Sequence, residues 1–131
     1  QLSIYAENKK GALQTMTNAL YEAGINIWGS VTNDGAEYGI NRMVVSDPDK
    51  AKEVLTERGY LCRFVDVLAV EIEDKPGALN TLLTALLDSN VNVDYTYLSF
   101  NRDSSTPVMI LHTADPEEVE ICLKAKGFKM V

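Results

Sequence analysis

The sequence predicts an α+β fold in which one small β-α-β-β-α-β unit occurs twice. Strand-like and helical segments follow one another in that order, and the order restarts near residue 67 without a linker. Residues 7–27, moved by 66 positions onto residues 73–93, share nine identities in 21 positions. An internal repeat of this length indicates two copies of one supersecondary unit. Each copy matches a four-stranded antiparallel sheet with two helices on one face, a ferredoxin-like sandwich. We therefore expect two domains, at residues 1–66 and 67–131.

Two periodicities alternate along the first copy. Apolar and polar residues alternate in its strand-like segments, whereas its helical segments carry apolar side chains three and four positions apart. Gly24 and Gly59 end the helices, and Ser46-Asp47-Pro48 caps the start of the second helix. The Asp34-Gly35 pair predicts a hairpin between the two middle strands. The expected elements are strand 2–7, helix 11–23, strand 25–33, strand 37–46, helix 48–58 and strand 60–65.

The second copy repeats this succession. Asp115-Pro116 starts its second helix, as Asp47-Pro48 does in the first copy, and Gly127 ends it. A copy of about 65 residues is marginal as a free-standing domain, so we expect the two copies to support each other. The leucines of its first helix are Leu79, Leu82, Leu83, Leu86 and Leu87. The expected elements are strand 67–72, helix 78–89, strand 91–100, strand 107–113, helix 116–125 and strand 128–131.

The stretch from Glu73 to Leu79 has the pattern of a strand end, a tight turn and a helix start. Proline is favoured in the first turn of a helix, where we expect Pro76, because its missing N–H would have no partner there. Gly77 would let the backbone come close to a bound group. The unpaired N–H groups of a first helical turn, with the helix dipole, attract a carboxylate or a phosphate. Residues 7–13 repeat the stretch, so we expect this anion-binding turn twice.

The composition argues against several classes of partner. The formal net charge is −7, with 19 acidic and 12 basic residues. Such a chain repels nucleic-acid phosphates and anionic lipid, so we expect neither as a partner. No segment resembles a signal peptide, and no apolar run approaches the ~18 residues of a membrane span. We expect a soluble, cytoplasmic protein. Because Gln1 already stands in a strand-like pattern, we also expect further residues to precede it.

Residue types that often carry catalysis lack suitable companions in this sequence. His112 is the only histidine, lies mid-strand, and has no cysteine at metal-ligand spacing. Cys62 and Cys122 stand in apolar contexts, which favours small buried side chains. Ser104-Ser105 lies in a polar turn without a base partner. We therefore expect no metal, no cofactor and no enzymatic activity.

Two motifs relate the chain to a known family. The turn from Asp74 to Leu79 and the Asn-Val and Asn-Ile pairs that begin at Asn92 and Asn26 resemble the motifs of ACT domains. These are small regulatory modules that bind amino acids. The resemblance covers nearly the whole chain and is strongest to a stand-alone tandem ACT protein without a catalytic domain. The sequence departs from the pattern at Lys10, where the family usually has proline, and at Asp74, where asparagine is common.

The resemblance implies a regulatory protein that binds a free amino acid at the interface between two ACT domains. In the family, two units commonly lie side by side, with their sheets joined at the second strands. Backbone N–H groups of the glycine turns would hold the ligand carboxylate, and side-chain oxygens its ammonium group. A sensor without a catalytic domain also implies a partner, and we expect a homodimer and a target enzyme. By position, the implied ligand-binding residues are Asn8, Gly11, Ala12, Leu13, Asn26, Ile27, Asp74, Gly77, Ala78, Leu79, Asn92 and Val93.

Strand geometry limits how these residues can combine. The turn with Asn8 follows the first strand, and the helix returns the chain, so Asn26 begins the second strand at the opposite end. Seven strand residues span about 23 Å at ~3.3 Å each, so Asn8 and Asn26 cannot both touch one small ligand. An antiparallel seam between the units predicts two crossed sites, Asn8 with Asn92 and Asp74 with Asn26.

Three classes of function stay open from the sequence. The glycine turns are also explained as structural features of a duplicated fold, and Asn26 and Asn92 as turn residues. The alternative to an amino-acid sensor is therefore a structural or dimerising ferredoxin-like module without a small-molecule ligand. A small enzyme of mutase or cyclase type would use the same fold. Trp28 and Tyr95 are expected near the seam, as packing or as ligand contacts.

Overall fold

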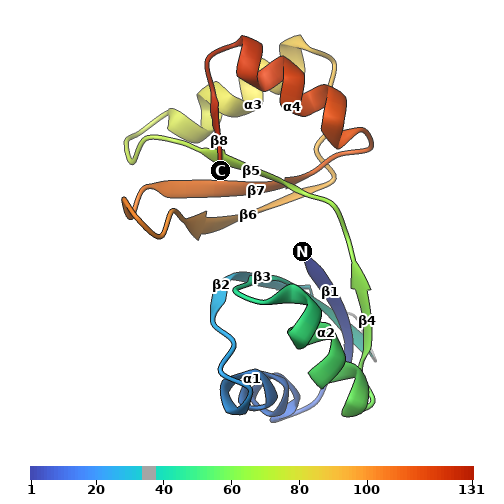
Figure 1. Cartoon of the computed structure of the whole chain (residues 1–131). Helices are drawn as coiled ribbons and strands as arrows, with labels where there is room; N and C mark the ends of the chain where they lie inside the picture. The colour runs from blue at the N-terminus through green and yellow to red at the C-terminus, as the bar shows by residue number, and fades with distance from the viewer. Residues whose placement is uncertain (34–37) are drawn as a thin grey trace. The chain divides into compact units, whose positions relative to one another are not determined.

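The computed structural model describes residues 1–33 and 38–131. The chain divides into two compact units, Gln1–Val65 (unit 1) and Asp66–Val131 (unit 2). Each unit is a four-stranded antiparallel sheet with its two helices on one face, in the order β-α-β-β-α-β (Figure 1). The ferredoxin-like fold predicted for both copies is therefore confirmed. The hairpin predicted at Asp34-Gly35 lies outside the described residues.

The two sheets have corresponding strand orders, β2-β3-β1-β4 in unit 1 and β6-β7-β5-β8 in unit 2. The second strand of each copy, β2 or β6, therefore lies at an edge of its own sheet. Unit 1 consists of β1 (Leu2–Glu7), α1 (Ala12–Glu22), β2 (Ile27–Asn33), β3 (Tyr38–Val45), α2 (Pro48–Glu57) and β4 (Leu61–Phe64). Unit 2 consists of β5 (Leu68–Glu71), α3 (Ala78–Asp88), β6 (Tyr95–Phe100), β7 (Pro107–His112), α4 (Pro116–Ala125) and β8 (Lys129–Met130).

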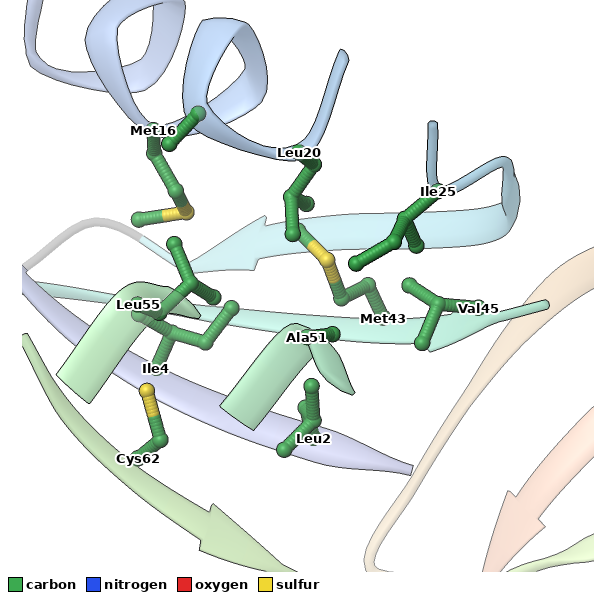
Figure 2. Packing of buried hydrophobic residues seen from close by; sticks show 11 residues of the cluster. Leu2, Ile4, Met16, Leu20, Ile25, Met43, Val45, Ala51, Leu55 and Cys62 are labelled. Atoms are coloured by element: carbon green, nitrogen blue, oxygen red, sulfur yellow. The ribbon is translucent and has the colours of Figure 1, made fainter. Parts of the chain in front are cut away.

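The core of unit 1 lies between its helices and its sheet. Met16 and Leu20 extend from α1, and Leu55 from α2, toward Ile4 and Met43 on the central strands (Figure 2). All five side chains are fully buried. Full burial of an aliphatic side chain of this size contributes about 1.5–3 kcal/mol, so these contacts hold the helices to the sheet. The helix–sheet packing in turn fixes the positions of both ends of α1.

The core of unit 2 uses two of the five leucines of α3. Leu82 and Leu86 are buried, together with Leu111 of β7 and Leu123 of α4. The remaining three leucines of the helix lie toward solvent, and Leu87 is 75% exposed. The inward face of α3 is therefore narrow, and Leu79, Leu83 and Leu87 beside it are exposed.

The strands of unit 2 are shorter than predicted, and the difference is largest for β6. The sequence predicted a strand over residues 91–100, but β6 begins at Tyr95. Val91 and Val93 still pack against the core, because an irregular extended segment can bury alternate side chains without a ladder. Asn92 therefore precedes the strand by three residues rather than opening it, whereas Asn26 lies directly before β2.

None of the helices that the structure describes is both long enough and apolar enough to cross a bilayer.

Candidate functional site

The two glycine turns have the same geometry, and both are type II β-turns. Gly11 has φ 83° and ψ −5°, and Gly77 has φ 86° and ψ −8°. In each turn, the alanine after the glycine donates its N–H to the carbonyl oxygen of the lysine three positions earlier. The distances are 3.1 Å from Ala12 to Lys9 and 3.2 Å from Ala78 to Lys75. A type II turn needs a positive φ at its third residue, which glycine adopts without strain.

Pro76 lies before the helix rather than in its first turn, so that expectation was wrong. α3 begins at Ala78 with Gly77 as its N-cap, which leaves Pro76 at the second position of the β-turn. Proline is favoured there because its fixed φ suits the turn. Lys10 takes the same position in unit 1. A Cβ built on Gly77 would meet nothing within 4 Å, so the backbone conformation requires this glycine, and no close neighbour does.

The turns leave the starts of α1 and α3 open to an anion. Helix geometry gives the first-turn N–H groups no intrahelical acceptor. Gly11 and Gly77, as N-caps, have no side chain that could accept from these groups. Thr15 and Thr81 instead donate their hydroxyls to the carbonyl oxygens of these glycines, at 2.9 and 3.0 Å. A carboxylate at either helix start would therefore meet N–H donors and the positive end of the dipole.

Two cavities flank the start of α1, and Ala12 lines both of them. The larger has a volume of about 830 Å³ and is lined by Lys9, Lys10 and Arg58, among others. The smaller has a volume of about 150 Å³, and Asn8 and Leu13 are among its lining residues. Both cavities are thus lined by residues that the sequence analysis predicted to bind a ligand.

Two of the three cations that line the larger cavity are paired with carboxylates of the same unit. Lys9 Nζ lies 2.9 Å from Glu7 Oε2, and the hydrogen bond to this carboxylate, with its charge, raises the pKa of Lys9. Arg58 is 2.8 Å from Glu22. Lys9 therefore stays protonated at neutral pH, and the larger cavity keeps its cationic lining.

Unit 2 has a smaller cavity at the corresponding place. Its volume is about 360 Å³, and Lys75, Ala78, Thr81 and Lys129 are among its lining residues. Lys75 lies 2.7 Å from Glu73, which repeats the lysine–glutamate pair of unit 1. Asp74, Gly77 and Leu79 lie at the exposed surface beside it.

In each unit, the turn residue and the strand-start asparagine lie at opposite ends of the sheet. Glu7 pairs with Tyr38 at one end of β3, whereas Ile27 pairs with Val45 at the other. Asn8 and Asn26 are therefore separated by the length of the sheet. The register of unit 2 separates Asp74 from Asn92 in the same way. The structure thus brings neither pair together within its own unit, while Ile27 and Val93 pack against the cores.

Asn92 belongs to a polar cluster that the sequence did not reveal. Its amide Nδ2 donates to Asp94 Oδ1 at 3.2 Å, and Asp94 Oδ2 lies 2.8 Å from His112 Nδ1. The His112 ring stacks on Tyr95, with centroids 4.9 Å apart and planes 5° from parallel. The stacked pair is set by the β6–β7 register, which no local pattern encodes. In unit 1, Asn26 is held differently, because its N–H donates to Ser46 Oγ at 2.9 Å.

A second polar cluster lies in unit 1, beside the cavity that contains Asn8. Asn41 is 2% exposed and donates from Nδ2 to Ser30 Oγ at 3.0 Å and to Thr32 Oγ1 at 2.8 Å. Asn41 and Thr32 both line the 150 Å³ cavity. The register places Asn41 opposite Ile4, and in unit 2 the corresponding partner of Val70 is Met109. The two copies therefore differ in polarity at this end of the sheet.

A family model described as an ACT domain pair matches residues 1–130. The chain belongs to this family. The crystal structure of protein BT0572 from Bacteroides thetaiotaomicron is similar to this ACT pair, with 30% identity and a TM-score of 0.90 over 99% of this chain and 89% of that one. The comparison with curated proteins gives no match.

Two regulatory subunits of aspartate kinase are also similar to this ACT pair. The subunit from Thermus thermophilus, in ligand-free form, has 16% identity and a TM-score of 0.65, over 95% of this chain and 89% of that one. The subunit from Thermus flavus has 18% identity and a TM-score of 0.62, over 95% and 88%. At these identities, the likeness establishes the shared ACT fold.

Among the described residues, no group of three or more histidine, cysteine, aspartate or glutamate side chains is arranged to hold a metal ion.

Proposed function

We propose that this ACT pair is a regulatory protein that binds a free amino acid. The observation that carries the proposal is the repeated type II turn, which presents an uncapped helix start to a cavity in each unit. Backbone N–H groups there suit a carboxylate. Membership of the ACT family and similarity to aspartate kinase regulatory subunits support a regulatory role rather than a catalytic one.

The ligand ammonium would be held by the side-chain oxygens of the asparagines that precede β2 and β6, or by Asp74. An amide oxygen accepts hydrogen bonds and a carboxylate accepts stronger, charge-assisted ones. In unit 2, the bond from Asn92 Nδ2 to Asp94 fixes the amide so that its oxygen is left to accept. Asn92 is therefore suited to bind an ammonium group.

We further propose that each site combines the turn of one unit with the strand-start asparagine of another. Within one unit the two are separated by the length of the sheet, as the register of β3 and β7 supports. A small ligand that uses both would therefore need a turn and an asparagine from different units. The pairings are Asn8 with Asn92 and Asp74 with Asn26, within one chain or in a homodimer.

The two sites would differ in what they accept. The hydroxyl and amide groups of Thr32 and Asn41 beside Asn8 favour a ligand with a polar side chain. Met109 occupies the corresponding register position in unit 2 and favours an apolar one. We also propose a cytoplasmic location and a target enzyme as the recipient of the signal. The acidic net charge makes nucleic acid an unfavourable partner.

The proposal is tested by a thermal-shift screen with each of the common amino acids, followed by calorimetric titration of the hits. Binding to the folded state raises the melting temperature by mass action, with about 2.7 kcal/mol of added stability at a hundredfold excess over the dissociation constant. Asn92→Ala should weaken binding by about tenfold or more without changing the fold. Asn18→Ala, at an exposed position in the middle of α1, is the matched control and should bind normally.

The proposal is wrong if no amino acid shifts the melting temperature at millimolar concentration. The outcome would then favour a dimerising module that uses its edge strands. Loss of binding in Asn92→Ala counts only where the circular dichroism spectrum and the melting temperature of the variant match those of the wild type.

A further inference from the structure

A cavity in unit 2, on the helix side of the sheet, is distinct from the glycine turns. Its volume is about 420 Å³, and it lies between the end of α3, the start of α4 and the segments that flank β6 and β7. A water molecule takes about 30 Å³ of liquid volume, and pockets for small molecules begin at about 300 Å³. The space is therefore large enough for a small organic molecule.

Three residues that line this cavity are more polar than the corresponding residues of unit 1. In unit 1, the three corresponding residues are Ala23, Val45 and Val54, all of which belong to the core or pack against it (Figure 2 shows Val45). In unit 2 the three positions hold Ser89, Thr113 and Cys122, and all three line the cavity. Ser89 and Ala23 are both helix C-caps, which fixes the correspondence.

The other two correspondences, of Thr113 with Val45 and of Cys122 with Val54, follow from the Asp-Pro pairs at which the second helices start. Val45 stands two residues before Asp47 and Thr113 two residues before Asp115. Val45 is the last residue of β3, and Thr113 directly follows β7. Because both copies adopt the same fold, the change from apolar to polar is not required by the architecture.

The hydroxyl of Thr113 has no hydrogen-bond partner among the described residues, although the residue is only 3% exposed. Burial of an unpaired hydroxyl costs about 1–3 kcal/mol, and a valine would fill the same space without that cost. Ser89 is satisfied, because its hydroxyl donates to Ala85 O at 3.0 Å and contacts Cys122 Sγ at 3.0 Å. The Thr113 hydroxyl is therefore the group in the cavity lining that lacks a hydrogen-bond partner among the described residues.

The rim of the cavity is anionic. Its described lining residues include Asp94, Asp115 and Glu118, but no lysine, arginine or histidine. Asp94 is engaged with His112. Asp115 makes no side-chain cap bond at the start of α4, and neither it nor Glu118 has an ion-pair partner among the described residues. Two carboxylates without cations, above a buried hydroxyl, suit a cation that also forms hydrogen bonds.

We propose that this cavity of unit 2 binds a small primary amine that carries a hydroxyl or similar polar group. The ammonium group contacts Asp115 and Glu118, and the polar group pairs with the Thr113 hydroxyl. The site is separate from the proposed amino-acid site and does not depend on it. Asn92 and Asp94 are common to both, and the test leaves them unchanged.

The probe is ethanolamine, titrated as its hydrochloride into the full chain labelled with ¹⁵N, and followed by two-dimensional ¹H–¹⁵N NMR. Ethylene glycol, in which a hydroxyl replaces the ammonium, is the neutral control, and sodium chloride controls for ionic strength. Saturable shifts are expected at residues 89–94 and 113–122 with ethanolamine, and much weaker ones with ethylene glycol.

Variants that restore the lining of the first copy provide the matched test. Thr113→Val should weaken ethanolamine binding about threefold to tenfold, the usual effect of one lost hydrogen bond. Ser89→Ala, Thr113→Val and Cys122→Val together should abolish it and raise the melting temperature. Asp115→Asn with Glu118→Gln changes only exposed side chains, so it should weaken binding without a risk of unfolding.

The proposal is overturned if ethanolamine gives no saturable shifts, because Thr113 would then be satisfied by water alone. It is also overturned if ethylene glycol binds equally well, or if the triple variant binds as the wild type does. Shifts at residues 8–13 and 74–79 instead would place the amine at the glycine turns. Amino-acid binding is measured separately by calorimetry, so failure here leaves that result unaffected.

Discussion

Nδ1 of His112 lies 2.8 Å from Oδ2 of Asp94, and the other oxygen of the same carboxylate accepts a hydrogen bond from the Asn92 amide. The carboxylate therefore connects a stacked aromatic pair to the residue proposed to hold the ligand ammonium. Asp94 acts as a positioning residue, because it fixes which atom of Asn92 faces outward.

Asp94→Ala should leave stability nearly unchanged but weaken amino-acid binding. The His112–Asp94 pair is partly exposed, and such pairs contribute about 0–1 kcal/mol. Without the carboxylate, the Asn92 amide loses the bond that orients it. Urea unfolding measures the first effect and calorimetric titration the second. Asp103→Ala, in the exposed turn after β6, is the control. Equal affinities in the two variants would refute the positioning role.

Lys10→Pro should raise the free energy of unfolding by about 0.4–1 kcal/mol. Lys10 occupies the second position of a type II turn, where unit 2 already has proline and where a φ near −65° is suitable. Proline reduces the freedom of the unfolded chain without a change in the folded turn. The midpoint of urea unfolding should rise at an unchanged m-value.

Pro76→Ala is the reciprocal change and should lower stability by a similar amount. A destabilised Lys10→Pro variant would show that the two turns are not interchangeable.

Leu82→Ala should destabilise the protein by about 2–5 kcal/mol, because truncation leaves a cavity in the core of unit 2. Leu82 is fully buried, whereas Leu87 on the same helix is 75% exposed. Leu87→Ala should therefore change stability by less than about 0.5 kcal/mol. Chemical denaturation of the two variants gives the comparison, and similar losses in both would contradict the assigned inward face of α3.

The Cys62 thiol should stay protonated and react slowly in the native protein. Burial raises its pKa above the ordinary 9.0, although the nearby charge of Lys52 and a hydrogen bond with Thr56 act in the opposite direction. A raised thiol pKa contributes stability that is fully present below pH 9.0 and is lost as the pH rises through the folded-state value.

Thiol labelling of Cys122→Val, which leaves Cys62 as the single cysteine, measures this reactivity. The labelling rate at neutral pH should rise strongly when urea unfolds the chain. Fast labelling of the native variant would show that the thiol is accessible.

Much of the fold follows from local patterns in the sequence. The first strand is found at the predicted residues, and glycines and Asp-Pro pairs mark most helix ends within a residue or two. The prediction was weakest where tertiary contacts override local preference. Val91 and Val93 have strand character, but they pack against the core from an irregular segment. Pro76 matched a helix start as well as a turn, and only the φ of Gly77 distinguishes the two.

The site was predictable only in part. The repeated glycine turns are contiguous in sequence, so they could be found there. The contacts of Asp94 with His112 and of Asn41 with Thr32 cross between strands 9 to 18 residues apart, and depend on register. No sequence motif shows that the Thr113 hydroxyl lacks a hydrogen-bond partner among the described residues, because that depends on which side chains the fold places around it.

The covalent joining of two copies has an evolutionary consequence. A single-copy protein that dimerises carries every mutation on both subunits, so its two halves must stay identical. Here the polar residues of one copy lie around Asn41 and those of the other around Thr113, at opposite ends of the same architecture. Duplication within one gene removes that constraint, because each copy can change without the other.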